Sequence, residues 1–225
     1  MEPRAAAAAA QPHGQPAAVS AAAAPQGGHP PSEGGGASLR CEGKHPGGLE
    51  IRAATHDDAE AITALYSGHV AHGTASFELS PPDIAEMRRR MGALLAEGYP
   101  WFCAIVEGSI VGYAYAGPYR PRPAYRYTVE DSVYLAPAVQ RRGIGAALLA
   151  RLIEACTRRG DRQMIAVIGD SANAPSIALH ARAGFVEAGR LANVGYKFDR
   201  WLDIVLMQRA LGDGAISAPA ARPMR

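Results

Sequence analysis

The sequence has little cysteine and no cysteine pattern: Cys41, Cys103 and Cys156 are the three in 225 residues. No Cys-x-x-Cys pair occurs, so the sequence predicts neither a zinc site nor a disulfide framework, and no metal is expected. Cys103 and Cys156 lie in apolar stretches, which indicates small core residues. Free cysteines fit a reducing compartment, and we expect a cytoplasmic protein.

Long apolar runs and a strong charge imbalance are also missing. No run approaches the roughly 18 apolar residues that span a bilayer. The alanine-rich start is interrupted at 11–14 and contains no leucine, which argues against a signal peptide, and Arg4 alone is too little arginine for a transit peptide. The formal net charge of +2 is too small to indicate a nucleic-acid partner. We therefore expect neither a membrane nor a nucleic acid as partner.

Large apolar side chains are scarce in the first 47 residues, where Val19 and Leu39 are the exceptions. A segment of this composition buries too little surface to offset its ordering entropy, so residues 1–47 are predicted to be a disordered extension. Residues 48–211 are enough for one sizeable core. The chain is again rich in alanine and proline at 212–225, where we expect a flexible tail.

The apolar periodicity within 48–211 predicts alternating strands and helices. The expected elements are strands at 49–54, 101–106, 110–116, 125–135, 164–168, 185–187 and 201–208, and helices at 55–72, 80–98, 144–160 and 173–182. The continuous apolar run at 164–168 is typical of a strand covered on both faces. The order β-α-α-β-β-β-α-β-α-β-β predicts an α/β (α+β) fold, a mixed sheet with helices on both faces.

The second predicted helix is expected to start with Ser80 as its cap, followed by two prolines. Its three consecutive arginines at 88–90 are expected in solvent. Residues 191–200 are expected to connect the last two strands. Helical spacing predicts a buried face of Ile84, Met87, Met91 and Leu94.

The stretch Gln-Arg-Arg-Gly-Ile-Gly-Ala at 140–146 separates a predicted strand from a predicted helix. Its glycines allow the backbone to approach a ligand, and the free N–H groups of a helix N-terminus point at anionic oxygens. Arg141 and Arg142 add positive charge. The spacing fits neither a Rossmann site nor an NTPase loop. Alone, the stretch predicts a phosphate-binding turn, and a helix that merely begins with glycines is the alternative.

This stretch matches Gln/Arg-x-x-Gly-x-Gly/Ala, and with the element order it resembles the GNAT N-acetyltransferases, which bind acetyl-coenzyme A. Other motifs, in order over about 50–210, resemble the phosphinothricin and methionine sulfoximine N-acetyltransferases within that superfamily. They are Thr-Ala-Ser-Phe-Glu at 74–78, Ala-Gly-Pro-Tyr-Arg at 116–120, Tyr-Thr-Val-Glu-Asp-Ser-Val-Tyr at 127–134, Ala-Val-Ile at 166–168, Leu-His-Ala-Arg-Ala-Gly-Phe at 179–185 and Gly-Tyr-Lys-Phe-Asp-Arg-Trp-Leu-Asp at 195–203. The N-terminal extension lies outside the resemblance.

The resemblance implies acetyl transfer from a thioester to an amine. This reaction needs a base for the amine, donors for the developing oxyanion and a proton source for the leaving thiolate. The resemblance places the base at Glu130, whose pKa desolvation would raise; a strand glutamate paired with an arginine such as Arg126 is the alternative. His180 is implied as a general acid or a second base, and a hydrogen-bonded structural histidine is the alternative.

The resemblance also implies two sets of binding residues. Asn173 belongs to the cofactor set and also suits a helix N-cap. Arg126 is expected to hold a substrate carboxylate with its guanidinium fork. The implied cofactor contacts are Val133, Tyr134, Leu135, Arg141, Arg142, Gly143, Ile144, Gly145, Ala146 and Asn173. The implied acceptor contacts, each of which alone would be typical of a solvated surface, are Phe77, Glu78, Arg120, Arg126, Tyr127 and Lys197.

Three classes of function stay open at this point. The first is an enzyme that acetylates a small amino acid or analogue such as phosphinothricin, methionine sulfoximine or methionine sulfone. The second is an acetyltransferase for a protein N-terminus, a polyamine or an aminoglycoside, and arginine-bearing loops speak against a polycation. The third is a non-catalytic acetyl-coenzyme A-binding module, which would need neither Glu130 nor His180. The resemblance further implies a homodimer with residues 191–200 near the partner, and a detoxifying or resistance activity.

Overall fold

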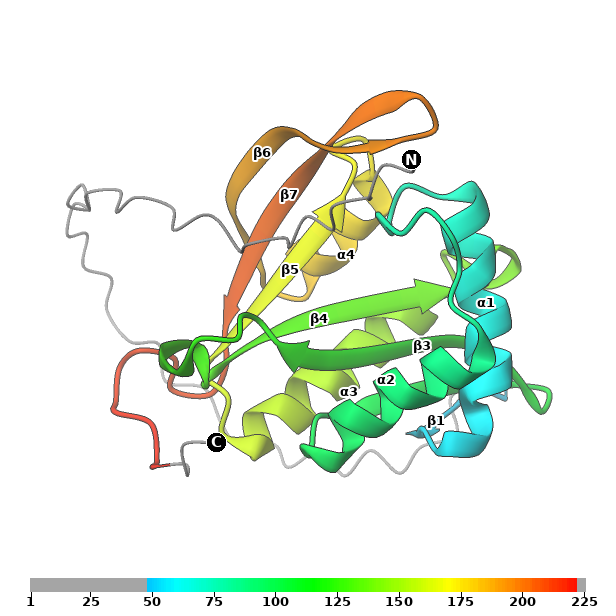
Figure 1. Cartoon of the computed structure of the whole chain (residues 1–225). Coiled ribbons are helices and arrows are strands. Elements are labelled where there is room, and N and C mark those ends of the chain that lie inside the picture. The colour runs from blue at the N-terminus through cyan, green and yellow to red at the C-terminus, as the bar shows by residue number, and fades with distance from the viewer. Residues whose placement is uncertain (1–47, 222–225) are drawn as a thin grey trace, which may run out of the picture. The chain divides into compact units, whose positions relative to one another are not determined.

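The computed structural model describes residues 48–221, so the predicted extension at 1–47 and residues 222–225 lie outside it. Within the described range, seven strands form one sheet in the order β1-β2-β3-β4-β5-β7-β6. Figure 1 shows β3, β4, β5, β7 and β6 side by side in this order. The strands are β1 (Glu50–Ala53), β2 (Trp101–Val106), β3 (Ser109–Pro118), β4 (Thr128–Leu135), β5 (Gln163–Gly169), β6 (Val186–Lys197) and β7 (Arg200–Ala210). The α-helices are α1 (Ala59–His72), α2 (Ile84–Ala96), α3 (Ile144–Arg159) and α4 (Ala174–Arg182). The predicted order of elements is confirmed.

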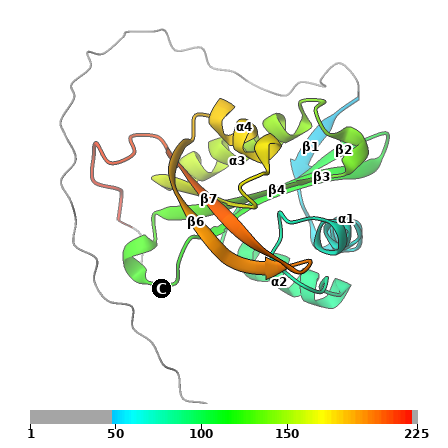
Figure 2. The ribbon, with the colours of Figure 1, turned by 90° about the horizontal axis from the view of Figure 1, so that it is seen from above.

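One strand pair in this sheet is parallel, and all the others are antiparallel. β4 and β5 run in the same direction, and α3 makes the crossover that a parallel pair requires. The sheet is therefore mixed, as predicted. Figure 2 shows α1 and α2 on one side of the sheet and α3 and α4 on the other.

Each face of the sheet has its own apolar core. On the α3 face, Leu148, Leu149 and Leu152 pack with residues of β4 and β5 such as Val129. On the α1 face, helical residues pack with an aromatic group on β2 and β3. Cys156 is buried in the first core and Cys103 in the second, which confirms both as core residues.

The prediction for α2 was wrong at its start and at one residue of its buried face. The helix begins at Ile84, and its cap is Asp83, whose Oδ1 accepts a hydrogen bond from the Glu86 backbone N–H at 2.7 Å. The preceding prolines stay outside the helix, so the Ser80 cap does not form. Met87 and Met91 are buried as expected, but Ile84 is 40% exposed because it lies in the first turn, beyond the edge of the core.

The strand boundaries also differ from prediction at two places. β4 begins at Thr128, because Pro123 starts a 3-10 turn over Pro123–Tyr125. Residues 191–197 are not a connection: they continue β6, and only Phe198 and Asp199 form the turn to β7, both with positive φ. An irregular register between Leu191 and Gly195 breaks the alternation that would have marked this strand.

The segment after β7 returns to the start of β4. Tyr127 Oη donates a hydrogen bond to the Ala220 carbonyl at 2.8 Å, and Arg162 donates to Ser217 and to the Ala218 carbonyl. Residues 212–221 therefore lie against the end of the sheet where β4 and β5 are paired. Within 48–221 no helix has the length and apolar character needed to cross a membrane.

Candidate active site

A cleft opens in the middle of the sheet where β4 and β5 separate. Their parallel pairing runs from Thr128 opposite Gln163 to Asp131 opposite Ala166 and then stops, although β4 stays paired with β3 as far as Leu135. Figure 1 shows the two strands diverging toward the C-terminal end of β4. The cleft is lined by Ala75, Asp131, Ser132, Val133, Tyr134, Ala166, Val167, Ile168, Gly169, Asn173, Ser176 and His180. The unpaired edge of β4 can hydrogen-bond an extended ligand as a further strand would.

The glycine turn at 140–146 follows β4 and begins α3 at the open end of this cleft. Gly143 is the N-cap with φ 81°, which favours glycine, and Arg141 also has positive φ at 60°. No side chain caps the helix within the described residues. The first-turn N–H groups of α3 are therefore available to an anion, and the exposed Arg141 and Arg142 add charge. A phosphate-bearing cofactor fits this turn.

Two residues of the turn are packed into the protein. The Ile144 side chain is 3% exposed and joins the α3 core, so it offers a ligand only its backbone. Gly145 is buried, and a Cβ there would lie 3.2 Å from Leu135 Cδ1 and 3.5 Å from Leu179 Cδ2. A large side chain at 145 would therefore disrupt the packing of α3 on β4 and α4, and it would not test cofactor binding alone.

Of the other predicted cofactor contacts, Val133, Tyr134 and Asn173 are at the cleft, whereas Leu135 and the exposed Ala146 are not among its lining residues. Val133 and Tyr134 line it, and the Leu135 carbonyl lies 2.9 Å from His69 Nε2. Asn173 has both expected features: it lines the cleft, and its Oδ1 accepts a hydrogen bond from the Ser176 backbone N–H at 3.3 Å as the N-cap of α4.

Glu130 and His180 lie on opposite faces of the sheet. Side chains alternate along β4, so Val129 and Asp131 face α3 and α4, whereas Glu130 and Tyr134 face α1 and α2. Glu130 is half-buried. Burial and the nearby Asp131 raise the pKa of Glu130, and Arg120 opposes them. Glu130 is paired with Ile165 just before the strands separate, and it does not line the cleft itself. A carboxyl group with a raised pKa beside the cleft suits a general base.

His180 is buried on α4 with both ring nitrogens engaged. Nδ1 lies 2.8 Å from the Ser176 carbonyl, and Nε2 lies 2.9 Å from Asp131 Oδ2. Burial lowers the pKa of His180, but the hydrogen bond and charge of Asp131 outweigh it and leave this pKa raised. This geometry favours the structural alternative for His180, because neither N–H is directed at a ligand.

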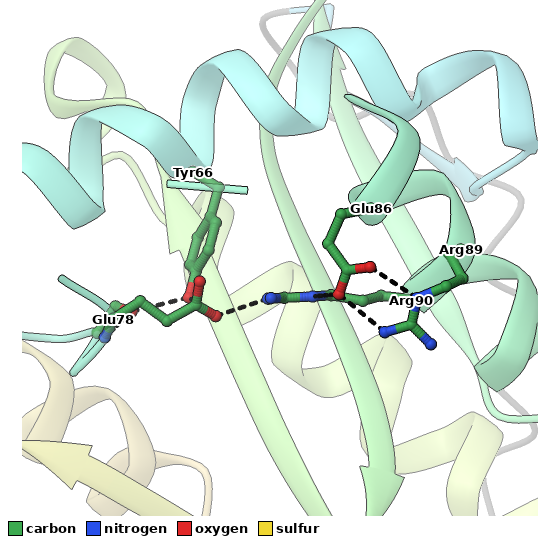
Figure 3. A network of polar contacts seen from close by, with 6 residues as sticks. Tyr66, Glu78, Glu86, Arg89 and Arg90 are labelled. Atoms are coloured by element: carbon green, nitrogen blue, oxygen red, sulfur yellow. Dashed lines mark hydrogen bonds and ion pairs between the residues drawn. The ribbon is translucent and has the colours of Figure 1, made fainter. Parts of the chain in front are cut away.

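The loop 73–78 carries two predicted acceptor contacts and covers the cleft from the α1 face. The Phe77 ring packs on two glycines: a Cβ on Gly195 would lie 2.2 Å from it, and one on Gly169 would lie 3.0 Å from it. Glu78 Oε1 accepts hydrogen bonds from Tyr66 Oη at 3.1 Å and from Arg90 Nη1 at 2.6 Å (Figure 3). Phe77 and Glu78 are therefore held in one place beside the cleft.

Lys197 holds this loop. Its side chain is buried, and Nζ donates to the carbonyls of Gly73 at 2.9 Å and Ser76 at 2.8 Å. Burial lowers the pKa of Lys197, and Glu78 opposes this. With its ammonium bound to backbone oxygens, Lys197 positions the loop of Phe77 and Glu78 and does not lie in solvent.

The three remaining predicted acceptor contacts separate into two groups. Arg120 lies over the Tyr119 ring, within electrostatic reach of Glu130. Arg126 lies over the Tyr127 ring and donates to the Pro123 carbonyl at 3.2 Å. Tyr127 immediately precedes β4, at the end where β4 and β5 are paired. The structure thus brings Glu78 and Arg120 to the side of Glu130. It places Phe77 against Gly169 and Gly195, and Arg126 and Tyr127 away from Glu130.

Sequence reasoning missed three residues at this site. Asp131 forms the pair with His180. Arg90, predicted in solvent, is half-buried between Glu78 and Glu86 (Figure 3). Tyr115 lies opposite Ser132 on the Glu130 face; burial raises its pKa, and the charges of Glu130, Arg90 and Glu78 also act on it. The alternation of strand residues could have placed Tyr115 beside Glu130.

Known proteins share this architecture and sequence. The Acetyltransferase (GNAT) family model matches residues 55–185. Phosphinothricin N-acetyltransferase of Alcaligenes faecalis is 52% identical over 169 residues, covering 75% of this chain and 86% of the relative. The L-methionine sulfoximine/L-methionine sulfone acetyltransferase of Pseudomonas paraeruginosa is 41% identical over 170 residues, covering 75% and 98%.

A solved structure agrees with these relatives. The phosphinothricin acetyltransferase of Sinorhizobium meliloti, solved in complex with acetyl-coenzyme A, superposes with a TM-score of 0.74 at 45% identity, covering 76% of this chain and 93% of that one. The chain therefore belongs to the GNAT family of acetyltransferases. Within residues 48–221, no group of three or more His, Cys, Asp or Glu side chains is arranged to hold a metal ion.

Proposed function

We propose that this enzyme transfers the acetyl group of acetyl-coenzyme A to the amino group of a small amino acid analogue of the phosphinothricin or methionine sulfoximine type. The observation that carries the proposal is Glu130, a half-buried carboxylate with a raised pKa on β4, where this strand leaves β5. The named activities of the relatives support the same donor and acceptor class.

The donor fits the cleft and the turn at its end. The unpaired edge of β4 from Ser132 to Leu135 would hold the pantetheine arm, and the first turn of α3 with Arg141 and Arg142 would hold the pyrophosphate. Backbone N–H groups of Val133 to Leu135 are the proposed donors to the thioester oxygen, as electrostatic stabilisation of an oxyanion requires.

The acceptor fits the opposite, α1-facing side. Tyr115 lies on this side, stacked on the buried Trp101 with ring centroids 4.2 Å apart. The charges of Glu78, Glu130 and Arg90 act on Tyr115. The Arg120 guanidinium acts on Glu130. A site with both signs of charge suits a zwitterion better than a polycation. We assign the substrate carboxylate to Arg120 in preference to Arg126.

Glu130 would take a proton from the acceptor ammonium, directly or through water. The amine nitrogen then attacks the thioester carbon, so that a C–N bond forms and the C–S bond breaks, and the nitrogen releases its second proton to solvent as the amide forms. The thiolate leaves with the electron pair and takes its proton from solvent. We give His180 no proton transfer, because its N–H groups are engaged by Ser176 and Asp131.

A thiol-release assay tests this function. Purified protein with acetyl-coenzyme A is mixed with phosphinothricin, methionine sulfoximine, methionine sulfone, spermidine or kanamycin. We expect turnover with the first three. Turnover with the two polycations alone would overturn the proposed acceptor class, and cofactor binding without turnover of any amine would identify a non-catalytic module.

The proposal includes a homodimer that uses the β6–β7 hairpin. Large apolar side chains are exposed along it, among them Trp201 at 60%, Tyr196 at 54% and Phe198 at 51%. A patch of this kind indicates a protein–protein contact. Light scattering after size-exclusion chromatography should give twice the chain mass, and a monomer at micromolar concentration would contradict it.

Cytoplasmic location and resistance to herbicide or antibiotic amino acids remain predictions.

A further inference from the structure

Asp131 has a buried oxygen without a protein partner at the point where the cleft begins. Its side chain is 1% exposed, and Oδ2 lies 2.9 Å from His180 Nε2. Its other oxygen, Oδ1, is also buried, and no donor among residues 48–221 reaches it. Asp131 lines the cleft together with Ser132 and Ile168. A buried carboxylate oxygen is unfavourable unless a hydrogen-bond donor meets it.

The protein partners fix which atoms carry hydrogen. The Ser176 carbonyl only accepts, so Nδ1 of His180 carries a proton and donates to it. Nε2 lies at hydrogen-bond distance from Oδ2, so one proton lies between these two atoms. Whichever of the two atoms carries it, Oδ1 carries none; Oδ1 is therefore an acceptor, and the matching ligand group is a donor. The Phe185 ring meets the other side of His180 edge-on, so the pair is closed off there.

The cleft indicates which donor this is. β4 loses its β5 partner just after Asp131, so an extended chain of peptide-like groups fits along Ser132 to Leu135. Acetyl-coenzyme A carries such a chain, because its pantetheine arm contains two secondary amides, each with one N–H. The acceptor amine belongs to the opposite face with Glu130, and it is therefore not the donor to Oδ1.

We propose that Asp131 is a cofactor-binding residue: its Oδ1 accepts a hydrogen bond from an amide N–H of the pantetheine arm, and His180 is the buried hydrogen-bond partner that holds the carboxyl group in place. This inference rests on the proposed function, since it takes acetyl-coenzyme A as the donor. In this proposal His180 contributes to cofactor binding indirectly, by holding Asp131 in position.

Calorimetric titration with acetyl-coenzyme A tests whether Asp131 contributes to cofactor affinity. Asp131→Ala should raise the Kd about 10- to 100-fold, the range for hydrogen bonds to charged groups. Asp131→Asn should raise it less than tenfold, because its Nδ2 can donate to neutral His180 while its oxygen faces the cleft. Asp57→Asn, on an exposed residue of the same type, is the matched control and should bind as the wild type does.

A second variant keeps the test valid if Asp131→Ala fails to fold with an unpaired histidine. Asp131→Ala combined with His180→Phe removes both charges, a replacement that buried ion pairs often tolerate. It should show the same loss of affinity, and circular dichroism would check that it is folded.

The ligand side uses two acetyl-coenzyme A analogues, in each of which CH₂ replaces one amide N–H of the arm. One of them should bind the wild type at least tenfold more weakly than acetyl-coenzyme A does, and this loss should vanish in Asp131→Ala. Equal affinity of the wild type and Asp131→Ala, or analogue losses that are the same in both proteins, would overturn this inference alone. A wild type that does not bind acetyl-coenzyme A would overturn the proposed function as well.

Discussion

The two faces of β4 carry two kinds of polar site. On the α4 face, Asp131 and His180 form a closed pair, 1% and 5% exposed, whose contacts are fixed by the fold. On the α1 face, Glu130 is half-buried, has a raised pKa and is surrounded by groups that reach solvent, such as Arg120. Adjacent residues of one strand thus have different chemistry. A closed ion pair suits the holding of a ligand, and an accessible carboxylate suits proton transfer.

The largest expected effect is on the α1 face. Glu130→Gln should lower kcat by about 10²-fold or more, since glutamine takes up no proton, while the Kd for acetyl-coenzyme A stays unchanged. Steady-state kinetics and calorimetry check the two parts. The wild-type kcat/KM should fall as pH decreases through the raised pKa of Glu130, because the base acts only when ionised. Glu60→Gln on exposed α1 is the control, and a Glu130→Gln rate equal to that of the wild type across pH 6 to 9 would remove Glu130 from the mechanism.

A smaller effect is expected where the loop 73–78 covers this face. Gly195→Ala places a methyl group 2.2 Å from the Phe77 ring. We expect kcat/KM for the acceptor to fall by about 10-fold, because a displacement of about 1 Å can cost up to 10²-fold, and stability to fall by about 1–3 kcal/mol. Acceptor kinetics and urea unfolding measure both.

Gly189 provides the matched control for this substitution. It lies in the same strand, and a Cβ added to it meets no atom within 4 Å. Gly189→Ala should leave acceptor kinetics unchanged. If the two alanine variants behave alike, Phe77 does not define the acceptor site.

The smallest expected effect is a shift in the pH profile caused by the charge beside Glu130; it comes in addition to the weaker acceptor binding that loss of the assigned carboxylate ligand Arg120 should cause. Arg120 lowers the pKa of Glu130, so Arg120→Gln should move the acidic limb of the kcat/KM profile to higher pH. Arg122→Gln, an exposed neighbour in the same loop, should not move it. If the acidic limb of the kcat/KM profile does not move in Arg120→Gln, the titrating group is not Glu130. The assignment of the base to the α1 face of β4 would then be wrong.

The order of elements could be predicted from the sequence, because the residues that face the two cores are apolar and recur with the period of a helix or a strand. The sequence was sufficient for the glycine turn because positive φ at Gly143 restricts the residue type. It was insufficient for the β6–β7 hairpin, where the irregular register between Leu191 and Gly195 hides the alternation.

The polar partners were harder to predict, for a physical reason. Asp131 and His180 are 49 residues apart, and only the crossover through α3 and β5 brings them together. Lys197 donates to backbone carbonyls of Gly73 and Ser76, which have no side-chain signature. Arg90 appears in a run of three arginines, and only its position on α2 opposite Glu78 distinguishes it from the others.

The divergence of β4 and β5 also has a kinetic consequence. An opening through the sheet would let the proposed donor enter along the strands while the acceptor arrives from the α1 face, so that both would be bound at once. We therefore expect direct transfer in a ternary complex, seen as intersecting rather than parallel lines in double-reciprocal initial-rate plots.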